Sequence, residues 1–484
     1  MTAVETNYHE GLLHRLVNIY QDVDTTILGA IADRVLARLD DASTPGIGAA
    51  SRWDESSCLL ISYADSITDG RKSSLACLGE FVETHLNDVI DSVHILPFFP
   101  STGDDGFSVM DYRAVDPRLG SWGDLTNMSS SRKIMADVIL NHGSRSSAWF
   151  RQFVDGEAPG NGYFLSVDDD FDVSHVIRPR EHALLQPVTT VGGEKKVWCT
   201  FSEDQVDFDF SNPLLLEEFI GIILDFIDHG VRILRLDAVG FLWKETGTTC
   251  LNLHQTHAII QLIRYIADIY DDETVIVTET NLPNHENLSY FGNGNEAHWI
   301  YNFSLPPLIL YSLLFADSSI LRRWSMSMPP ALIGTSYLNF LSSHDGFGMR
   351  PTEGLLDETQ RKRLFDRLEA NGSLFSRRAE ADGTTSVYEA NTTLFSAMEK
   401  SDGAPTGALS SARFIAAYAL MFGLEGIPAI YFNSLISAQN HTDGVARSGM
   451  KRRINRQKVE KDWLDDRISA PKSRERIDLD TLKH

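Results

Sequence analysis

Asp237, Glu279 and Asp345 each follow a short apolar run of the chain. The runs are residues 231–236, 274–278 and 337–344. Their apolar content and their length, which is too short for a helix, are typical of buried strands. A carboxylate at the exit of a buried strand is costly unless it is paired or used. Because several strand ends contribute to one site in a (β/α)8 barrel, three such acids predict one catalytic cluster.

Two of these acids, Asp237 and Glu279, are suited to cleaving a glycosidic bond with retention of configuration. That chemistry needs a nucleophilic carboxylate and a second carboxyl group that acts as acid and then as base, about 5 Å away. Neighbouring strand ends lie roughly 4.8 Å apart. Arg235 points to the same side as Asp237 and would keep it ionised, and the charge of Asp237 would raise the pKa of Glu279. Taken alone, Arg235 and Asp237 could also be a core ion pair.

Two histidines stand at strand ends as well. His142 closes the stretch 137–142, and His344 directly precedes Asp345. Each could hydrogen-bond a sugar hydroxyl, although a single histidine in such a place is more often structural. The set of strand-end motifs is therefore stronger evidence for a site than any one of its members.

The elements that must position these residues alternate between strand and helix. Candidate strands are residues 58–63, 91–98, 134–140, 231–239, 274–280, 298–304, 336–343 and 427–433. The clearest helices are 213–229, which Gly230 ends, and 253–269. Eight strands with intervening helices favour an α/β protein with a closed (β/α)8 TIM barrel over an open doubly wound sheet.

The domain organisation follows from the gaps between the strands. The predicted parts are a helical N-terminal extension (1–50), a catalytic barrel (51–142, 201–346 and 411–460), an insertion after the third strand (143–200), an insertion after the seventh (347–410) and a charged tail (461–484). Long insertions of this kind usually build a substrate pocket. The chain from Lys451 onward is charged and poor in apolar residues, which predicts partial disorder.

The composition and net charge of the chain argue against some classes of binding partner. The chain has 484 residues and a formal net charge of -24, so nucleic acid and anionic membranes are not expected as partners. No apolar stretch reaches the roughly 18 residues of a membrane-spanning helix, and the N-terminus lacks the apolar core of a secretion signal. The four cysteines form no CxxC pair and are interpreted as reduced thiols. A cytoplasmic location is expected.

The motifs together resemble those of the α-amylase superfamily, glycoside hydrolase family thirteen. The matching stretches, in order, are 137–142, 235–237, Glu279 and 344–345. The resemblance implies that Asp237 is the nucleophile, Glu279 the acid and base, and Asp345 a stabiliser of the transition state. Many amylases bind calcium through an Asn at the position of Asn141, but no metal and no other cofactor is expected here.

Further stretches resemble one branch, the sucrose-phosphorylase-like phosphorylases. They are residues 94–100, 104–107, 178–180, 235–241, 305–308 and 454–456. The resemblance implies that Asp104 binds glucose, that Phe107 is its apolar platform, and that Arg452, with Arg453 as a competitor, contacts glucose too. It also implies that Arg180 contacts phosphate, since phosphate near two carboxylates needs a cation to offset the repulsion.

Within that branch, segments such as 53–56 and 290–298 resemble the glucosylglycerate phosphorylases. The expected partners are therefore a small sugar substrate and inorganic phosphate, with Arg178, Arg180 and Arg350 forming a basic pocket for an anionic acceptor. A homodimer is possible. The branch normally carries a small β-rich domain after the stretch matching 454–456, and this domain is expected to be absent here.

Three alternatives to that function stay open. The first is a sucrose or sucrose 6'-phosphate phosphorylase, because a phosphorylated acceptor would also need a basic pocket. The second is a hydrolase or transglucosidase of the same superfamily, which would release or transfer glucose without phosphate. The third is an inactive carbohydrate-binding homologue, against which the presence of all three acids argues.

Overall fold

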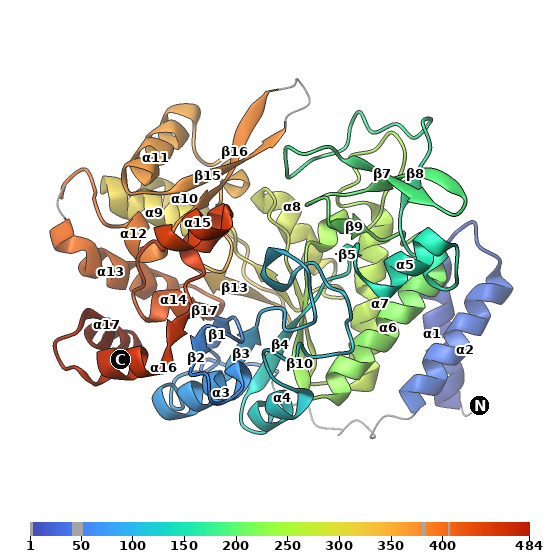
Figure 1. Ribbon diagram of the computed structural model, residues 1–484, viewed down its shortest axis with the longest axis horizontal. Coiled ribbons are helices and arrows are strands. Elements are labelled where there is room, and N and C mark those ends of the chain that lie inside the picture. The colour runs from blue at the N-terminus through green and yellow to red at the C-terminus, as the bar shows by residue number, and fades with distance from the viewer. Residues whose placement is uncertain (1–2, 41–51, 380–383, 405–406) are drawn as a thin grey trace.

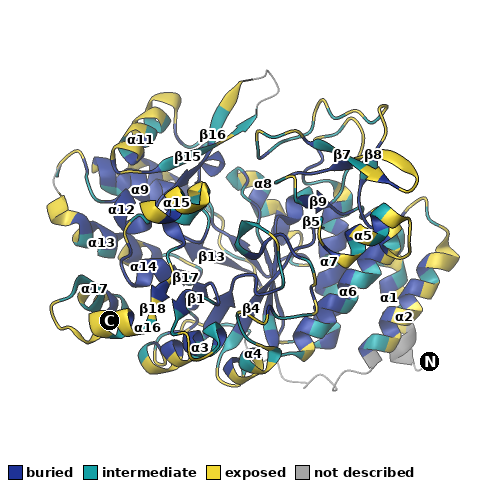
Figure 2. Ribbon diagram, in the orientation of Figure 1, coloured by how far each residue is buried: buried dark blue, intermediate teal, exposed yellow. Residues whose placement is uncertain are grey.

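A closed barrel of eight parallel strands lies at the centre of the computed structural model, which describes residues 3–40, 52–379, 384–404 and 407–484 (Figure 1). In order around the barrel, the strands are β1 (Leu59–Ser62), β17 (Ile427–Tyr431), β13 (Ser336–Phe340), β12 (Trp299–Tyr301), β11 (Val275–Thr278), β10 (Val231–Leu236), β4 (Lys133–Val138) and β3 (Ser92–Ile95). Their side chains are almost all buried, as Figure 2 shows. The predicted TIM barrel is confirmed, and each candidate strand overlaps one barrel strand.

The barrel is surrounded by helices that cover the outer faces of its strands. They are α3 (Ser74–His85), α4 (Trp122–Ser129), α6 (Pro213–Asp228), α7 (His254–Tyr270), α9 (Leu305–Phe315), α10 (Ser319–Ser327) and α13 (Ser410–Phe422). In α6, the side chain of Asn212 accepts a hydrogen bond from Leu214 N, and Pro213 occupies the first turn. The chain then leaves the helix at Gly230, whose φ of 92° favours glycine.

An N-terminal hairpin of α1 (Ala3–Ile19) and α2 (Thr25–Asp40) packs against α6 and α7. Tyr20, which follows α1, is buried against Trp243, with ring centroids 6.0 Å apart. Arg34 Nε lies 2.6 Å from Glu217 Oε1 of α6. Within the predicted extension, residues 3–40 form this hairpin, and residues 1–2 and 41–50 lie outside the described part.

Two insertions rise above the carboxyl ends of the barrel strands (Figure 1). The first holds β5 (His142–Ser144), α5 (Ala148–Asp155), η2 (Gly160–Gly162), β6 (Ser166–Val167), β7 (Leu185–Thr190), β8 (Gly193–Trp198) and β9 (Gln205–Asp207). The second holds β14 (Phe347–Gly348), η5 (Arg350–Thr352), α11 (Glu358–Ala370), β15 (Leu374–Ala379), β16 (Thr385–Asn391), α12 (Leu394–Ala397) and η6 (Gly407–Leu409). Residues 380–383 and 405–406 of the second insertion lie outside the described part.

The C-terminal segment is folded rather than partly disordered, so that expectation was wrong. After the last barrel strand the chain forms α14 (Phe432–Leu435) and α15 (Thr442–Ser448), and from Lys451 onward it forms η7 (Lys451–Asn455), β18 (Val459–Glu460), α16 (Lys461–Ser469) and α17 (Arg474–Lys483). Leu464, Ile468 and Leu479 are buried, and the Ser437 hydroxyl donates to Asp478 Oδ2 at 2.6 Å. The few apolar residues of this segment lie on the inward faces of its helices, and the average composition of the segment does not reveal that placement.

The short remaining elements are β2 (Ile67–Thr68), η1 (Asp104–Gly106), η3 (Val239–Phe241), α8 (Asn284–Leu288) and η4 (Ser289–Phe291). Of these, η1 and η3 carry residues of the site described next. Across the described ranges, every helix falls short of the length and apolarity that a bilayer crossing requires.

Candidate active site

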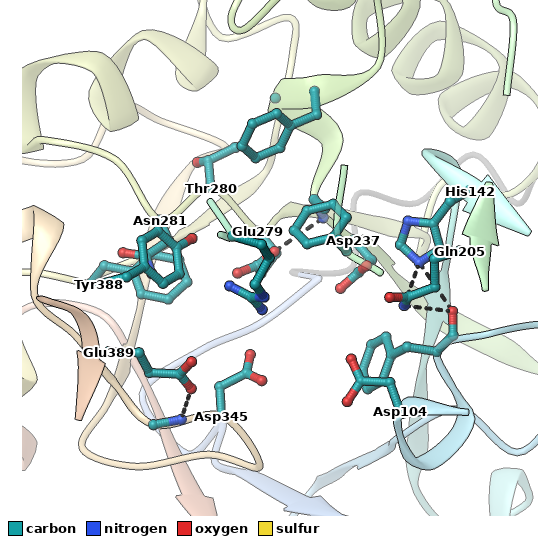
Figure 3. A pocket seen from close by; sticks show the side chains of 18 of the residues that line it. Asp104, His142, Gln205, Asp237, Glu279, Thr280, Asn281, Asp345, Tyr388 and Glu389 are labelled. Carbon is teal, nitrogen blue, oxygen red and sulfur yellow. Dashed lines mark hydrogen bonds between the residues drawn. The ribbon is translucent and has the colours of Figure 1, made fainter. Parts of the chain in front are cut away.

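The three predicted catalytic acids line one cavity at the carboxyl end of the barrel (Figure 3). Asp237 follows β10, Glu279 follows β11 and Asp345 lies beyond β13. Leu236 and Thr278 are paired across β10 and β11, so Asp237 and Glu279 leave adjacent strands side by side. The cavity encloses about 790 Å³, its open mouth included. The predicted residues Asp104, Phe107, His142, Arg180, His344 and Arg452 also line it.

Arg235 lies beneath the acids and is 2% exposed. Its Nη1 donates to Asp237 Oδ1 at 2.6 Å and also contacts Asp137, and its Nη2 is 3.9 Å from Glu279 Oε2. Asp137 is held on its other side by His94 Nε2 at 2.8 Å. The guanidinium therefore offsets the charge of Asp237 more closely than that of Glu279.

The environment of Asp237 and Glu279 favours one shared proton. Burial raises the pKa of the Glu279 carboxyl, Arg235 opposes the rise and the charge of Asp345 adds to it. Burial also raises the pKa of Asp237, while Arg235 lowers it and Glu279 raises it. Carboxyl groups that interact in this way titrate as a pair. Since Arg235 is closer to Asp237, the negative charge is better held on Asp237 and the proton on Glu279. Burial is the largest cause of the raised pKa at Glu279, and the neighbouring charge that adds to it is that of Asp345 rather than the predicted one, Asp237.

A strained turn after β10 holds the Glu279 carboxyl in place. Ala238 has a φ of 49°, in the left-handed region that non-glycine residues rarely adopt, and its N–H donates to Glu279 Oε2 at 3.0 Å. Backbone strain of this kind persists only where the surrounding structure fixes it. The turn continues into η3, where a side chain at Gly240 would meet Asn252 and Tyr290 at 3.1 Å. The wall of the cavity beside the acids is thus closely packed.

Asp345 belongs to a network on the opposite side of the cavity. Arg452 Nη1 lies 2.7 Å from Asp345 Oδ1 and 3.7 Å from Asp104 Oδ2, and Arg452 Nη2 lies 3.1 Å from Glu389 Oε2. Although burial acts in the opposite direction, Arg452 keeps the pKa of Asp345 below its usual value. Arg453 pairs instead with Asp105 and does not line this cavity. The structure therefore favours Arg452 over its competitor.

The aromatic platform is formed by two stacked rings. Phe107 and His344 lie with centroids 4.9 Å apart and planes 4° from parallel. Phe107 follows η1, in which Asp104 and Asp105 have φ values of 45° and 52°. A side chain at Gly106 would meet Pro97 O at 2.6 Å, so only glycine fits there. This strained loop aims Asp104 into the cavity.

His142 is fixed by hydrogen bonds on both sides of its ring. Its Nε2 lies 3.1 Å from Phe107 O and 3.0 Å from Gln205 Nε2, as Figure 3 shows. Its Nδ1 lies 3.3 Å from Asn141 Nδ2. Burial lowers the pKa of His142, so the ring is neutral at pH 7.

A buried lysine occupies the surroundings of Asn141. Lys244 Nζ donates to Asn141 Oδ1 at 2.8 Å and lies 2.7 Å from Asp207 Oδ2. Both side chains of the ion pair are buried, and Asp207 also accepts from Thr200 N and from Asn141 Nδ2. The side-chain oxygen of Asn141 thus accepts a hydrogen bond from the ammonium group of Lys244. The described residues contain no group of three or more His, Cys, Asp or Glu placed to hold a metal ion.

Of the three arginines predicted to bind anions, the structure brings only Arg180 to the cavity. Its guanidinium carbon lies 5.3 Å from the ring centroid of Tyr388 and 5.7 Å from that of Phe201. Arg180 Nη1 donates to Pro179 O at 3.1 Å, and none of the carboxylates in the described ranges pairs with it. Arg178 is half-buried and Arg350 is 8% exposed, and neither lines the cavity. Their predicted role stays a prediction.

Several residues of the cavity carry no sequence signal that singles them out. Gln205, Thr280, Asn281, Tyr388 and Glu389 are labelled in Figure 3. Glu389 is 2% exposed and accepts hydrogen bonds from Arg452 and from the backbone of Gly346. Tyr388 and Glu389 come from β16, a strand of the second insertion that was not predicted from the sequence. Only the contact with Arg452 identifies Glu389 as part of the site.

The fold and the three acids at strand ends define an enzyme of the alpha-amylase family, and comparison agrees. The model of the alpha amylase catalytic domain matches residues 86–345, and the chain belongs to that family. More particularly, it is 38% identical over 478 residues to a glucosylglycerate phosphorylase of Allomeiothermus silvanus, covering 98% of this chain and 84% of the relative. The resemblance that the motifs indicated is confirmed.

Two further relatives agree with this placement. A glucosylglycerate phosphorylase of Spirochaeta thermophila is 41% identical over 421 residues, covering 87% of this chain and 71% of the relative. Among solved structures, sucrose 6F-phosphate phosphorylase of Thermoanaerobacter thermosaccharolyticum superposes with a TM-score of 0.77 at 26% identity, covering 90% of this chain and 88% of the other.

Proposed function

We propose that this chain is a retaining α-glucoside phosphorylase that converts 2-O-α-D-glucosyl-D-glycerate and phosphate to α-D-glucose 1-phosphate and D-glycerate. The identity of 38% and 41% to glucosylglycerate phosphorylases supports the enzyme class and this donor. The observation that carries the proposal is Arg180, a cation without a carboxylate partner among the described residues, in the same cavity as Asp237 and Glu279. A hydrolase, whose second substrate is water, has no need of such a cation.

In the first step, Asp237 attacks the anomeric carbon and the bond to the glycerate oxygen breaks. Glu279 gives its proton to that oxygen, so D-glycerate leaves and a β-glucosyl-Asp237 ester remains. Asp345, whose pKa is held low by Arg452, stays ionised and stabilises the positive charge that develops on the sugar ring. Asp104 and Arg452 hold the glucosyl unit on the platform of Phe107.

In the second step, a phosphate oxygen attacks the anomeric carbon and the ester bond to Asp237 breaks. Glu279 accepts the proton of the attacking phosphate hydroxyl, which restores the starting protonation of both carboxyl groups. The glycerate oxygen that leaves and the phosphate oxygen that attacks occupy the same side of the anomeric carbon in turn. Arg180, a cation in the same cavity, offsets the charge of the attacking phosphate.

The test is a measurement of glucose 1-phosphate released from three donors, each with and without phosphate. The donors are glucosylglycerate, sucrose and sucrose 6'-phosphate, and Asp237→Asn is the inactive control. Phosphate-dependent release from glucosylglycerate alone supports the proposal. Release from sucrose or its phosphate instead would reassign the acceptor. Free glucose at the same rate with and without phosphate would show a hydrolase and contradict the phosphorylase assignment.

A further inference from the structure

A cationic segment crosses the rim of the cavity at η7. Arg452 and Arg453 of η7, and Arg456 directly after it, are all paired with carboxylates beside the glucose-binding side of the site. Lys451 differs from them. Its Nζ donates to the backbone carbonyl of Phe375 at 2.6 Å, and no carboxylate within the described ranges pairs with it. Lys451 is exposed and keeps its positive charge open to solvent.

Lys451 lines a second cavity, here called the vestibule, that adjoins the first. The vestibule encloses about 810 Å³, its open side included. It shares with the catalytic cavity the residues Asp104, Arg180, Phe201, Gln205, Glu389 and Arg452. Its other lining residues are Ser202, Ser376, Met450 and Lys451. The two cavities therefore adjoin at Arg180, which lines both of them.

The vestibule is positively charged although the chain has a net charge of -24. Its lining contains three cations, Arg180, Lys451 and Arg452, and two acids, Asp104 and Glu389, so one positive charge is in excess. Arg180 and Lys451 lack a carboxylate partner among the residues that the structure describes. A concave region with an excess of one sign raises the local concentration of ions of the opposite sign.

We propose that Lys451 is a specificity-determining residue that draws anionic substrates through the vestibule to Arg180. The substrate class is small dianions and carboxylates: phosphate on the way in, and the sugar phosphate donor of the reverse reaction. The inference rests on the phosphorylase function proposed above. A lysine ammonium on a flexible stem is a strongly hydrated point charge, suited to attracting an anion, whereas Arg180 offers the planar fork that holds one. Lys451 touches no reacting atom and acts on the capture of substrate alone.

The experiment compares Lys451→Gln with a matched control, Lys458→Gln, in the full chain. Lys458 is seven positions along the sequence, is ion-paired with Asp65 and lines a different cavity. Both variants lose one positive charge. Initial rates of glucose 1-phosphate release are measured against phosphate concentration at about 0.02 M and about 1 M ionic strength, where the screening length falls to about 3 Å.

For Lys451→Gln we expect kcat/KM for phosphate to fall about fivefold at low salt, with kcat unchanged, because one charge several ångströms from a dianion is removed in a water-like medium. The deficit relative to wild type disappears at high salt. Release of free glucose without phosphate, in which the nucleophile is neutral water, stays at the wild-type rate. Lys458→Gln matches wild type in every condition.

Three outcomes would overturn the inference. Lys451→Gln could behave like Lys458→Gln, its deficit could persist at 1 M salt, or it could slow reaction with water equally. Each of these would show that the charge of Lys451 does not act on the anion. A wild-type protein that forms no glucose 1-phosphate at any phosphate concentration would instead remove the proposed function, and this inference with it, so the two failures are distinguishable.

Discussion

Replacing Lys244 by Met should destabilise the protein by about 3 kcal/mol, because it leaves a buried carboxylate without its cation. The Lys244 side chain is 3% exposed and that of Asp207 is fully buried, with 2.7 Å between Nζ and Oδ2. Met fills a similar volume, so little of the cost comes from a cavity. Asp207 keeps hydrogen bonds from Thr200 and Asn141, which places the cost at the low end for a broken buried pair.

The expected change in melting temperature follows from the length of the chain. At about 2.1 cal/mol/K per residue, the unfolding entropy of 484 residues is roughly 1 kcal/mol/K. A loss of about 3 kcal/mol then lowers Tm by about 3 °C. Differential scanning calorimetry of Lys244→Met measures this shift directly.

Two further variants distinguish the effect of leaving a buried carboxylate unpaired from the effect of removing a lysine in general. Lys196→Met breaks the pair with Asp169, whose side chains are 52% and 87% exposed, and should lower Tm much less than Lys244→Met because solvent screens an exposed pair. The double variant Lys244→Met/Asp207→Asn removes both buried charges and should melt closer to wild type than Lys244→Met alone. The reasoning is refuted if Lys244→Met and Lys196→Met shift Tm equally, or if Asp207→Asn adds its full cost to Lys244→Met.

Three further outcomes are expected. Arg180→Ala should slow phosphorolysis about 100-fold but retain the initial burst of released acceptor that reports formation of the glucosyl-enzyme. An equal loss of rate in both steps would contradict the role of Arg180 in binding phosphate. Activity should fall on the alkaline side as Glu279 loses its proton, at a pH above the ordinary glutamic acid value because burial raises its pKa, and pH–rate profiles of kcat/KM measure this. Burial lowers the pKa values of His94, His298 and His344, so these rings stay neutral in the folded chain. Their contribution to the free energy of unfolding is fully present above about pH 6.5 and should be lost as the pH falls below that value, because the unfolded chain then takes up protons. Tm measured from pH 7.5 to pH 5 tests this.

The barrel and its acids could be predicted because both are encoded locally. Each strand is a short apolar run whose length and residue types predict its conformation without knowledge of the rest of the fold. Once eight such runs alternate with helices, the topology places every strand end on one face. Asp237 and Glu279 therefore lie side by side whatever conformation the intervening loops adopt, because the pairing of Leu236 with Thr278 aligns the two strand ends.

Residues outside the barrel strands were harder to predict, since long-range packing decides their positions. Arg178 and Arg180 are two residues apart in one loop, yet only Arg180 lines the cavity, beside Tyr388 of the second insertion. Glu389 becomes part of the site only because β16 folds back over the barrel and meets Arg452. The tail was misjudged for a related reason: few apolar residues suffice for burial when a surface such as α13 is available.

The catalytic groups and the cations proposed to select the second substrate come from different parts of the chain. The groups that would break the glycosidic bond stand on barrel strands or on turns that directly follow them, in surroundings closely packed around Ala238 and Arg235. The cations proposed to select the second substrate, Arg180 and Lys451, come from an insertion and from the C-terminal segment, and each is free of carboxylate partners within the described chain. Changes at those two positions should therefore alter which nucleophile resolves the glucosyl-enzyme while the first step proceeds, since neither contacts the network that holds Asp237 and Glu279.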